Sequence, residues 1–146
     1  MQTDPGKFFS KEQEQEIIAA ISQAETATSG EIRLHLIKRF KGEPMDEAKK
    51  IFFALGMQKT KLRNGCIIVV ALESKRVVVL GDKGINELLG QGFWQDVIVT
   101  LIERFKKEEY VQGLVEAIVQ IGDKLKKYFP YQKHDVNELS NDLSFG

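Results

Sequence analysis

Residues 64–85, NGCIIVVALESKRVVVLGDKGI, decide the fold of this chain. They contain two short apolar runs, 66–72 and 77–80, which are rich in valine and isoleucine and are separated by a few polar residues. Short β-branched runs joined by a polar turn are typical of a β-hairpin. Because a hairpin folds back on itself, we expect Asn64-Gly65 at its entry to lie beside Gly81-Asp82 at its exit.

The sequence on either side of this hairpin predicts helices above and below a small sheet. Both hairpin strands are almost uniformly apolar, which is typical of strands covered on both faces. Residues 31–38 alternate between apolar and polar side chains, so they predict a further strand. Helical spacing of apolar residues predicts a helix between that strand and the hairpin, another before it, and two long helices after the hairpin. The expected fold is an α/β sandwich.

The composition indicates one domain and gives no support for a nucleic-acid-binding or a membrane-spanning protein. The chain has 146 residues, 42% of them hydrophobic, and its 21 basic residues balance 21 acidic ones. We expect a single domain over residues 1–130 and a polar, loosely packed tail over residues 131–146. The zero net charge gives no argument for nucleic-acid binding. We expect no membrane span and no signal peptide, and therefore a cytoplasmic location.

A candidate metal site follows from the predicted topology. If the strand at 31–38 runs parallel to the first hairpin strand, Glu31 joins Asn64 and Asp82 at one edge of the sheet. Carboxylate and amide oxygens are the ligands that Ca²⁺ and Mg²⁺ prefer. Simpler roles stay open for each residue: Asp82 can cap a following helix, Asn64 can form a turn with Gly65, and Glu31 can pair with a basic side chain.

Other chemistry has less support in the sequence. The only histidines, His35 and His134, lie about a hundred residues apart, and a zinc site would need further cysteine or histidine partners. Trp94 and Phe105 share a helical stripe with apolar neighbours, which predicts that both belong to the core.

Several segments, taken in order, resemble the TPM domain family. The segments are Gly30-Glu31-Ile32-Arg33, Asn64-Gly65, Gly81-Asp82-Lys83-Gly84-Ile85, and Tyr110 with Gly113-Leu114. The resemblance covers residues 10–129. It implies a Rossmann-like three-layer α/β/α fold with a small mixed sheet, and a divalent-metal site in loops at one sheet edge. Many relatives read Gly-aromatic-Gly-aliphatic-Glu after the third strand. Here Glu87 falls one place later than that glutamate, so both Asp82 and Glu87 are candidate ligands.

Two functional hypotheses follow from the residues and the resemblance together. The first is a regulatory or interaction module that binds Ca²⁺ or Mg²⁺ through Glu31, Asn64, Asp82 and Glu87. The second is a metal-dependent acid phosphatase, an activity that the resemblance implies for some members. In that case the cation would polarise the phosphate ester and a bound water would attack it. The sequence shows no evident nucleophile for this reaction, which favours the first hypothesis.

Overall fold

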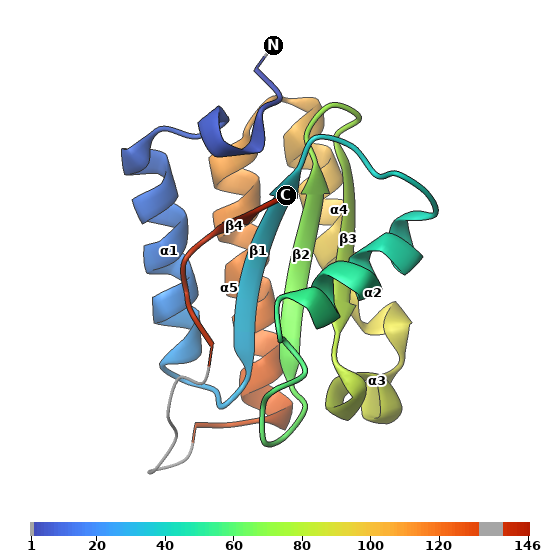
Figure 1. The fold of residues 1–146 in the computed structure, drawn as a ribbon. Helices are drawn as coiled ribbons and strands as arrows, with labels where there is room; N and C mark the ends of the chain where they lie inside the picture. The colour runs from blue at the N-terminus through green and yellow to red at the C-terminus, as the bar shows by residue number, and fades with distance from the viewer. Residues whose placement is uncertain (1, 132–138) are drawn as a thin grey trace.

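The structure is a computed structural model that describes residues 2–131 and 139–146 (Figure 1). Its helical elements are η1 (Pro5–Lys7), α1 (Lys11–Glu25), α2 (Pro44–Ala54), α3 (Lys83–Leu89), η2 (Gln91–Trp94), α4 (Gln95–Lys106) and α5 (Tyr110–Tyr128). Its strands are β1 (Glu31–Ile37), β2 (Gly65–Ala71), β3 (Arg76–Gly81) and β4 (Ser144–Phe145).

The strands form one four-stranded mixed sheet in the order β3-β2-β1-β4. The predicted hairpin is present, since β2 and β3 pair antiparallel with Ile68 opposite Val79. The predicted parallel pairing is also present, and it places Glu31 opposite Gly65 at the start of β1 and β2. This register depends on the alternation in β1, because a slip of one residue would turn its apolar side chains to the other face.

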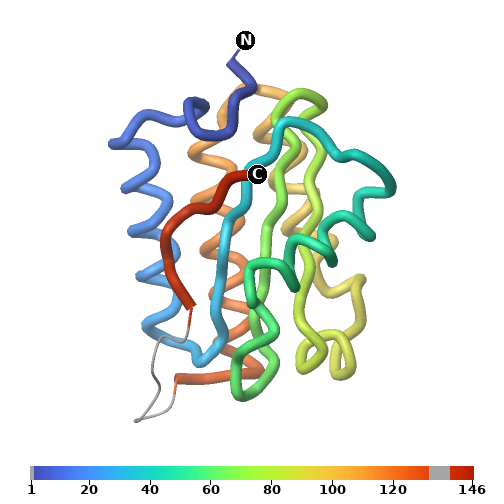
Figure 2. Tube along the Cα trace, in the orientation of Figure 1, coloured from blue at the N-terminus to red at the C-terminus, as the bar shows by residue number. Residues whose placement is uncertain are grey.

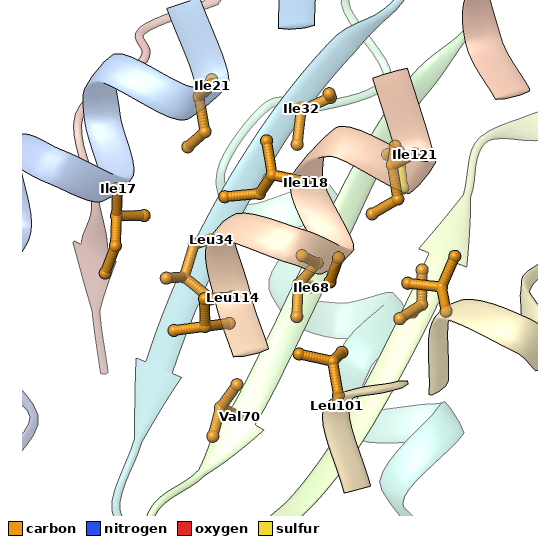
Figure 3. Close-up of a cluster of buried hydrophobic side chains, with 14 of the residues drawn as sticks. Ile17, Ile21, Ile32, Leu34, Ile68, Val70, Leu101, Leu114, Ile118 and Ile121 are labelled. Atoms are coloured by element: carbon orange, nitrogen blue, oxygen red, sulfur yellow. The ribbon is translucent and has the colours of Figure 1, made fainter. Parts of the chain in front are cut away.

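Helices cover both faces of the sheet, which confirms the expected α/β/α layers (Figure 1). On one face α1, α4 and α5 pack against apolar side chains of β1 and β2. Figure 3 shows this core, in which Leu34 and Ile68 of the sheet lie beside Leu114 and Ile118 of α5. On the other face α2 inserts Phe52 over a second, smaller apolar cluster. The larger of the two apolar cores therefore lies between the sheet and α1, α4 and α5.

The ends of the helices agree with the local sequence. Ser10 accepts a hydrogen bond from the backbone N–H of Gln13 at 3.1 Å, and the Gln13 side chain accepts one from the N–H of Ser10 at 2.9 Å. This reciprocal capping box begins α1. Trp94 and Phe105 are buried as predicted, whereas Ile102, which falls at the edge of the same helical stripe, is 40% exposed.

The end of the chain differs from the loosely packed tail that its polar sequence predicts. Ser144–Phe145 form β4, which pairs parallel with β1 (Figure 2). Leu143 and Ser144 are buried. The strand has two residues, too few for any periodic pattern. It forms because β1 would otherwise present an unpaired edge of backbone N–H and C=O groups. The middle of the predicted tail, residues 132–138, lies outside the described residues.

Candidate functional site

Three of the predicted metal ligands come to one edge of the sheet, where β1 and β2 begin. The backbone N–H of Glu31 donates to the carbonyl oxygen of Asn64 at 3.4 Å. The N–H of Asp82 donates to the carbonyl oxygen of Gly65 at 2.8 Å. The backbone therefore has the geometry expected from the hairpin and from the parallel pairing, and the side chains decide what this edge can bind.

The Asp82 carboxylate is already engaged by a cation. The guanidinium of Arg63 donates from Nε to Oδ2 at 2.7 Å and from Nη2 to Oδ1 at 2.9 Å. The N–H of Lys83 adds a third donor, at 2.7 Å from Oδ1, so Asp82 also caps α3. The hydrogen bonds that Arg63 donates to Asp82 raise the pKa of Arg63 above its usual value. A metal ion on this carboxylate would have to displace a guanidinium held in bidentate geometry.

Asn64 and Glu87 have separate partners. Asn64 is buried and donates from Nδ2 to Ser29 Oγ at 3.3 Å. Glu87 is exposed on α3, and one of its carboxylate oxygens lies 3.8 Å from Lys83 Nζ. Within the described ranges, no three His, Cys, Asp or Glu side chains gather into a metal-binding group. Among the described residues, the side chains of the four predicted ligands therefore do not surround a common metal position.

Glu31 lies instead near the carboxylate of Glu25, a residue that was not among the predicted ligands. Its side chain is buried, and its Oε1 accepts a hydrogen bond from the N–H of Leu139 at 2.8 Å. Glu25, the last residue of α1, accepts a hydrogen bond on Oε2 from the N–H of Ile32 at 2.8 Å. Each of these two carboxylates thus sits at the start of β1, and Asn141 of the C-terminal segment hydrogen-bonds to Glu25.

The electrostatics of Glu25 show that its negative charge is poorly compensated. The pKa of Glu25 is raised to about 7, chiefly by burial and to a smaller degree by the nearby Glu31 carboxylate, while hydrogen bonds from Ile32 and Asn141 act in the opposite direction. Glu25 Oε1 is buried with no hydrogen-bond partner among the described residues. A perturbed carboxyl group of this kind is a candidate for a functional site.

This raised pKa predicts how stability depends on pH. Between the ordinary value of 4.5 and about 7, the folded protein holds the Glu25 proton more tightly than the unfolded chain does. The contribution of Glu25 to the free energy of unfolding is therefore fully present below pH 4.5 and is lost as the pH rises through about 7. The loss is roughly 1–3 kcal/mol after allowance for solvent screening.

Denaturant unfolding of Glu25→Gln and wild type, without divalent metal, measures this effect. The difference in unfolding free energy should grow in favour of the variant from pH 4.5 to pH 7. Glu12→Gln, at an exposed position of the same helix, should show no such trend. A pH-independent difference for Glu25→Gln would contradict a buried, uncompensated carboxyl group.

Farther along the same face of β1, His35 anchors the C-terminal strand. His35 Nδ1 lies 2.8 Å from Ser144 Oγ, and the ring is buried between β1 and β4. The pKa of His35 is lowered to about 4, chiefly by burial and also by the charge of Arg33. The imidazole is therefore neutral at physiological pH, and its role in the fold is to hold β4 against β1.

Comparison with known families confirms the resemblance seen in the sequence. A family model described as "TPM domain" matches residues 2–124. The chain belongs to the TPM domain family. This assignment covers the whole sheet except β4, as well as the edge where Glu25, Glu31 and Asp82 lie.

Two solved structures are similar to this chain. The BA42 protein from the psychrophilic bacterium Bizionia argentinensis, solved by NMR, is 42% identical, with a TM-score of 0.91 over 99% of this chain and 100% of its own. The N-terminal domain of a P. gingivalis protein, also solved by NMR, is 20% identical, with a TM-score of 0.71 over 92% of this chain and 85% of its own. The second likeness concerns the fold alone. A comparison with curated proteins finds no match. In the part of the chain that the structure describes, no helix is both long and apolar enough to cross a membrane.

Proposed function

We propose that this TPM domain binds one divalent cation, Ca²⁺ or Mg²⁺, at the edge where β1 begins, and that binding serves a regulatory or interaction role. The observation that carries the proposal is the pair of carboxylates formed by Glu25 and Glu31 at the start of β1, where burial, and to a smaller degree the charge of Glu31, raises the pKa of Glu25. A hard cation between carboxylate oxygens would favour the ionised state of both groups.

The residues of this edge fit such a cation better than those around Asp82 do. Glu25 and Glu31 would supply carboxylate oxygens, whereas the Asp82 oxygens are held by Arg63 and by the N–H of Lys83. Asp82, Asn64 and Glu87 remain the alternative ligand set predicted from the sequence. That set requires Arg63 to leave Asp82 before a metal can bind.

The same contacts suggest how cation binding would affect the C-terminal segment. The C-terminal segment contacts both carboxylates, through the N–H of Leu139 on Glu31 and through Asn141 on Glu25. A cation held by Glu25 and Glu31 would change the charge against which this segment docks. Cation binding would therefore be coupled to the position of the chain end beside β1, as expected of a regulatory module rather than of an enzyme.

Calorimetric titration of the metal-stripped full chain with CaCl₂ and with MgCl₂ tests the proposal. Wild type should bind one cation, and at about a hundredfold excess over the dissociation constant the fold should gain about 2.7 kcal/mol in stability. Glu31→Gln and Glu25→Gln should each weaken binding by roughly tenfold or more, since each removes a charged ligand. The exposed Glu12→Gln variant serves as the control.

Asp82→Asn distinguishes the two ligand sets. It should lower the stability of the fold, because it weakens the contact with Arg63, while the cation affinity stays near the wild-type value. Loss of binding in Asp82→Asn with binding retained in Glu31→Gln would move the site to the Asp82 set. Wild-type protein that binds neither cation would overturn the proposed function. In an aryl phosphate assay, turnover above about 1 s⁻¹ that Glu31→Gln abolishes would favour the metal-dependent phosphatase instead.

A further inference from the structure

The outer edge of β1 is covered by the end of the chain along only part of its length. β1 has seven residues, and β4 pairs with two of them, His35 and Leu36. The N–H of Gly146 donates to the carbonyl oxygen of Leu36 at 2.9 Å. β4 lies on the side of β1 away from β2, at the edge of the sheet (Figure 1). The backbone groups of an edge strand are a template for pairing with a further strand.

Nearer the start of β1, side chains take the place of a neighbouring strand. The N–H of Ile32 donates to Glu25 Oε2 at 2.8 Å, and Ser144 Oγ donates to the carbonyl oxygen of Leu34 at 3.4 Å. Ile32, Leu34 and Leu36 alternate along β1, so their backbone groups point to the same side of the strand. A strand that paired along the whole edge would therefore make backbone hydrogen bonds that β4 does not make.

The end of the chain fits this edge through specific side-chain contacts. Leu143 is buried in the larger apolar core, which lies between the sheet and α1, α4 and α5. Ser144 Oγ contacts both the carbonyl oxygen of Leu34 and Nδ1 of His35, which is 2.8 Å away. A hydroxyl group can donate to the carbonyl and accept from the imidazole N–H at the same time. Leucine and serine at these two positions are thus matched to the groups that surround them.

The position of Gly146 leaves no room for a side chain. A Cβ atom there would lie 2.7 Å from His35 Nε2 and 3.2 Å from Ile37 Cγ2. The imidazole is not free to swing away, because it is buried and its other nitrogen contacts Ser144. Phe145, in contrast, is 43% exposed. The edge of β1 therefore selects the pattern Leu-Ser-x-Gly, in which x is any residue.

We propose that the outer edge of β1 is a docking site for an extended peptide strand of a partner protein that carries the pattern Leu-Ser-x-Gly. Residues 143–146 occupy this site within the chain until such a strand replaces them. The incoming strand runs parallel to β1, as β4 does, and also pairs with the start of β1, which favours it over the chain's own segment. In this mode of recognition, main-chain hydrogen bonds give affinity and side-chain contacts give specificity. The inference rests on the interaction role proposed above but not on the cation.

NMR titration of the full chain with a free peptide, without divalent metal, tests this inference. The peptide LSNDLSFG, which repeats residues 139–146, should produce saturable amide shifts in residues 32–37 and in residues 143–146 of the chain. A full-chain Ser144→Ala/Gly146→Val variant keeps β1 unchanged and weakens the docking of its own segment. It should bind the peptide roughly tenfold more tightly than wild type, because the chain's own segment fills the wild-type site most of the time.

Variants of the peptide test the pattern itself. Valine in place of the final glycine should weaken binding to the full-chain variant roughly tenfold, since its Cβ atom would meet His35. Alanine in place of the phenylalanine is the matched control and should leave the affinity unchanged, because Phe145 is exposed.

Three results would overturn the inference. The first is equal affinity for the glycine and valine peptides, and the second is equal affinity in wild type and the full-chain variant. The third is a lack of peptide binding by the variant while its amide spectrum is otherwise native; Gly146→Val alone replaces the double variant if the latter loses that spectrum. Dimerisation of wild type during sedimentation at the same concentrations would assign this edge to exchange between two copies, against a partner protein. Since metal is absent throughout, these results are independent of the calorimetric titration of the cation site.

Discussion

Replacing Trp94 with alanine is expected to destabilise the fold by roughly 3–5 kcal/mol, a large part of the stability of a domain of this size. Trp94 is fully buried at the junction of η2 and α4. Its ring edge lies 3.1 Å from the position that a Cβ atom would occupy on Gly81, and it packs edge-to-face against Phe93. Because this packing is close and involves several elements, the cavity left by the indole cannot collapse without shifting β3.

Chemical denaturation of Trp94→Ala measures this loss. Val99→Ala, on the same helix but with a side chain that is 43% exposed, is the matched control and should cost less than about 1 kcal/mol. Trp94→Phe should cost less than Trp94→Ala, because the indole N–H has no hydrogen-bond partner among the described residues. A loss below about 1 kcal/mol in Trp94→Ala would contradict a core role and indicate a surface function.

Gly84→Ala is expected to destabilise the fold by roughly 1–3 kcal/mol, although alanine normally stabilises a helix relative to glycine by about 1 kcal/mol. A Cβ atom on Gly84 would lie 2.3 Å from the carbonyl oxygen of Leu62 and 2.7 Å from that of Arg63. The N–H of Gly84 also donates to the Arg63 carbonyl at 2.8 Å. Since these contacts are with backbone atoms, the loop that presents Arg63 to Asp82 would have to move.

Thermal or denaturant unfolding tests this result against Gly92→Ala, where an added Cβ atom meets nothing within 4 Å. The control should change stability by no more than about 0.5 kcal/mol. A stabilised Gly84→Ala variant would show that the loop carrying Arg63 is not packed against α3 as described.

The hairpin and the parallel pairing could be predicted because they depend on local patterns. The apolar runs of β2 and β3 are continuous, and the intervening helix between β1 and β2 leaves few ways to connect them. β4 could not be predicted in this way. Its two residues gain their pairing from the free edge of β1, more than a hundred positions earlier in the chain.

In the candidate site, too, the features that follow from local sequence patterns could be predicted, and those that depend on individual side-chain contacts could not. The shared edge of Glu31, Asn64 and Asp82 followed from topology alone. Arg63, which engages Asp82, adopts a left-handed backbone conformation that the sequence does not signal for a residue other than glycine. Glu25 was within reach of sequence reasoning, because the short connection after α1 must return the chain to the start of β1.

Paramagnetic broadening by Mn²⁺, used in place of Ca²⁺ or Mg²⁺ on the full chain, tests the central claim most directly. A cation held by Glu25 and Glu31 should broaden the amide signals of residues 25, 31, 32 and 139 first, and Ca²⁺ should restore them by competition. Glu31→Gln should abolish this pattern at low Mn²⁺ concentrations. Broadening centred on residues 82–87, or spread evenly over exposed acidic residues, would contradict a cation site at the start of β1.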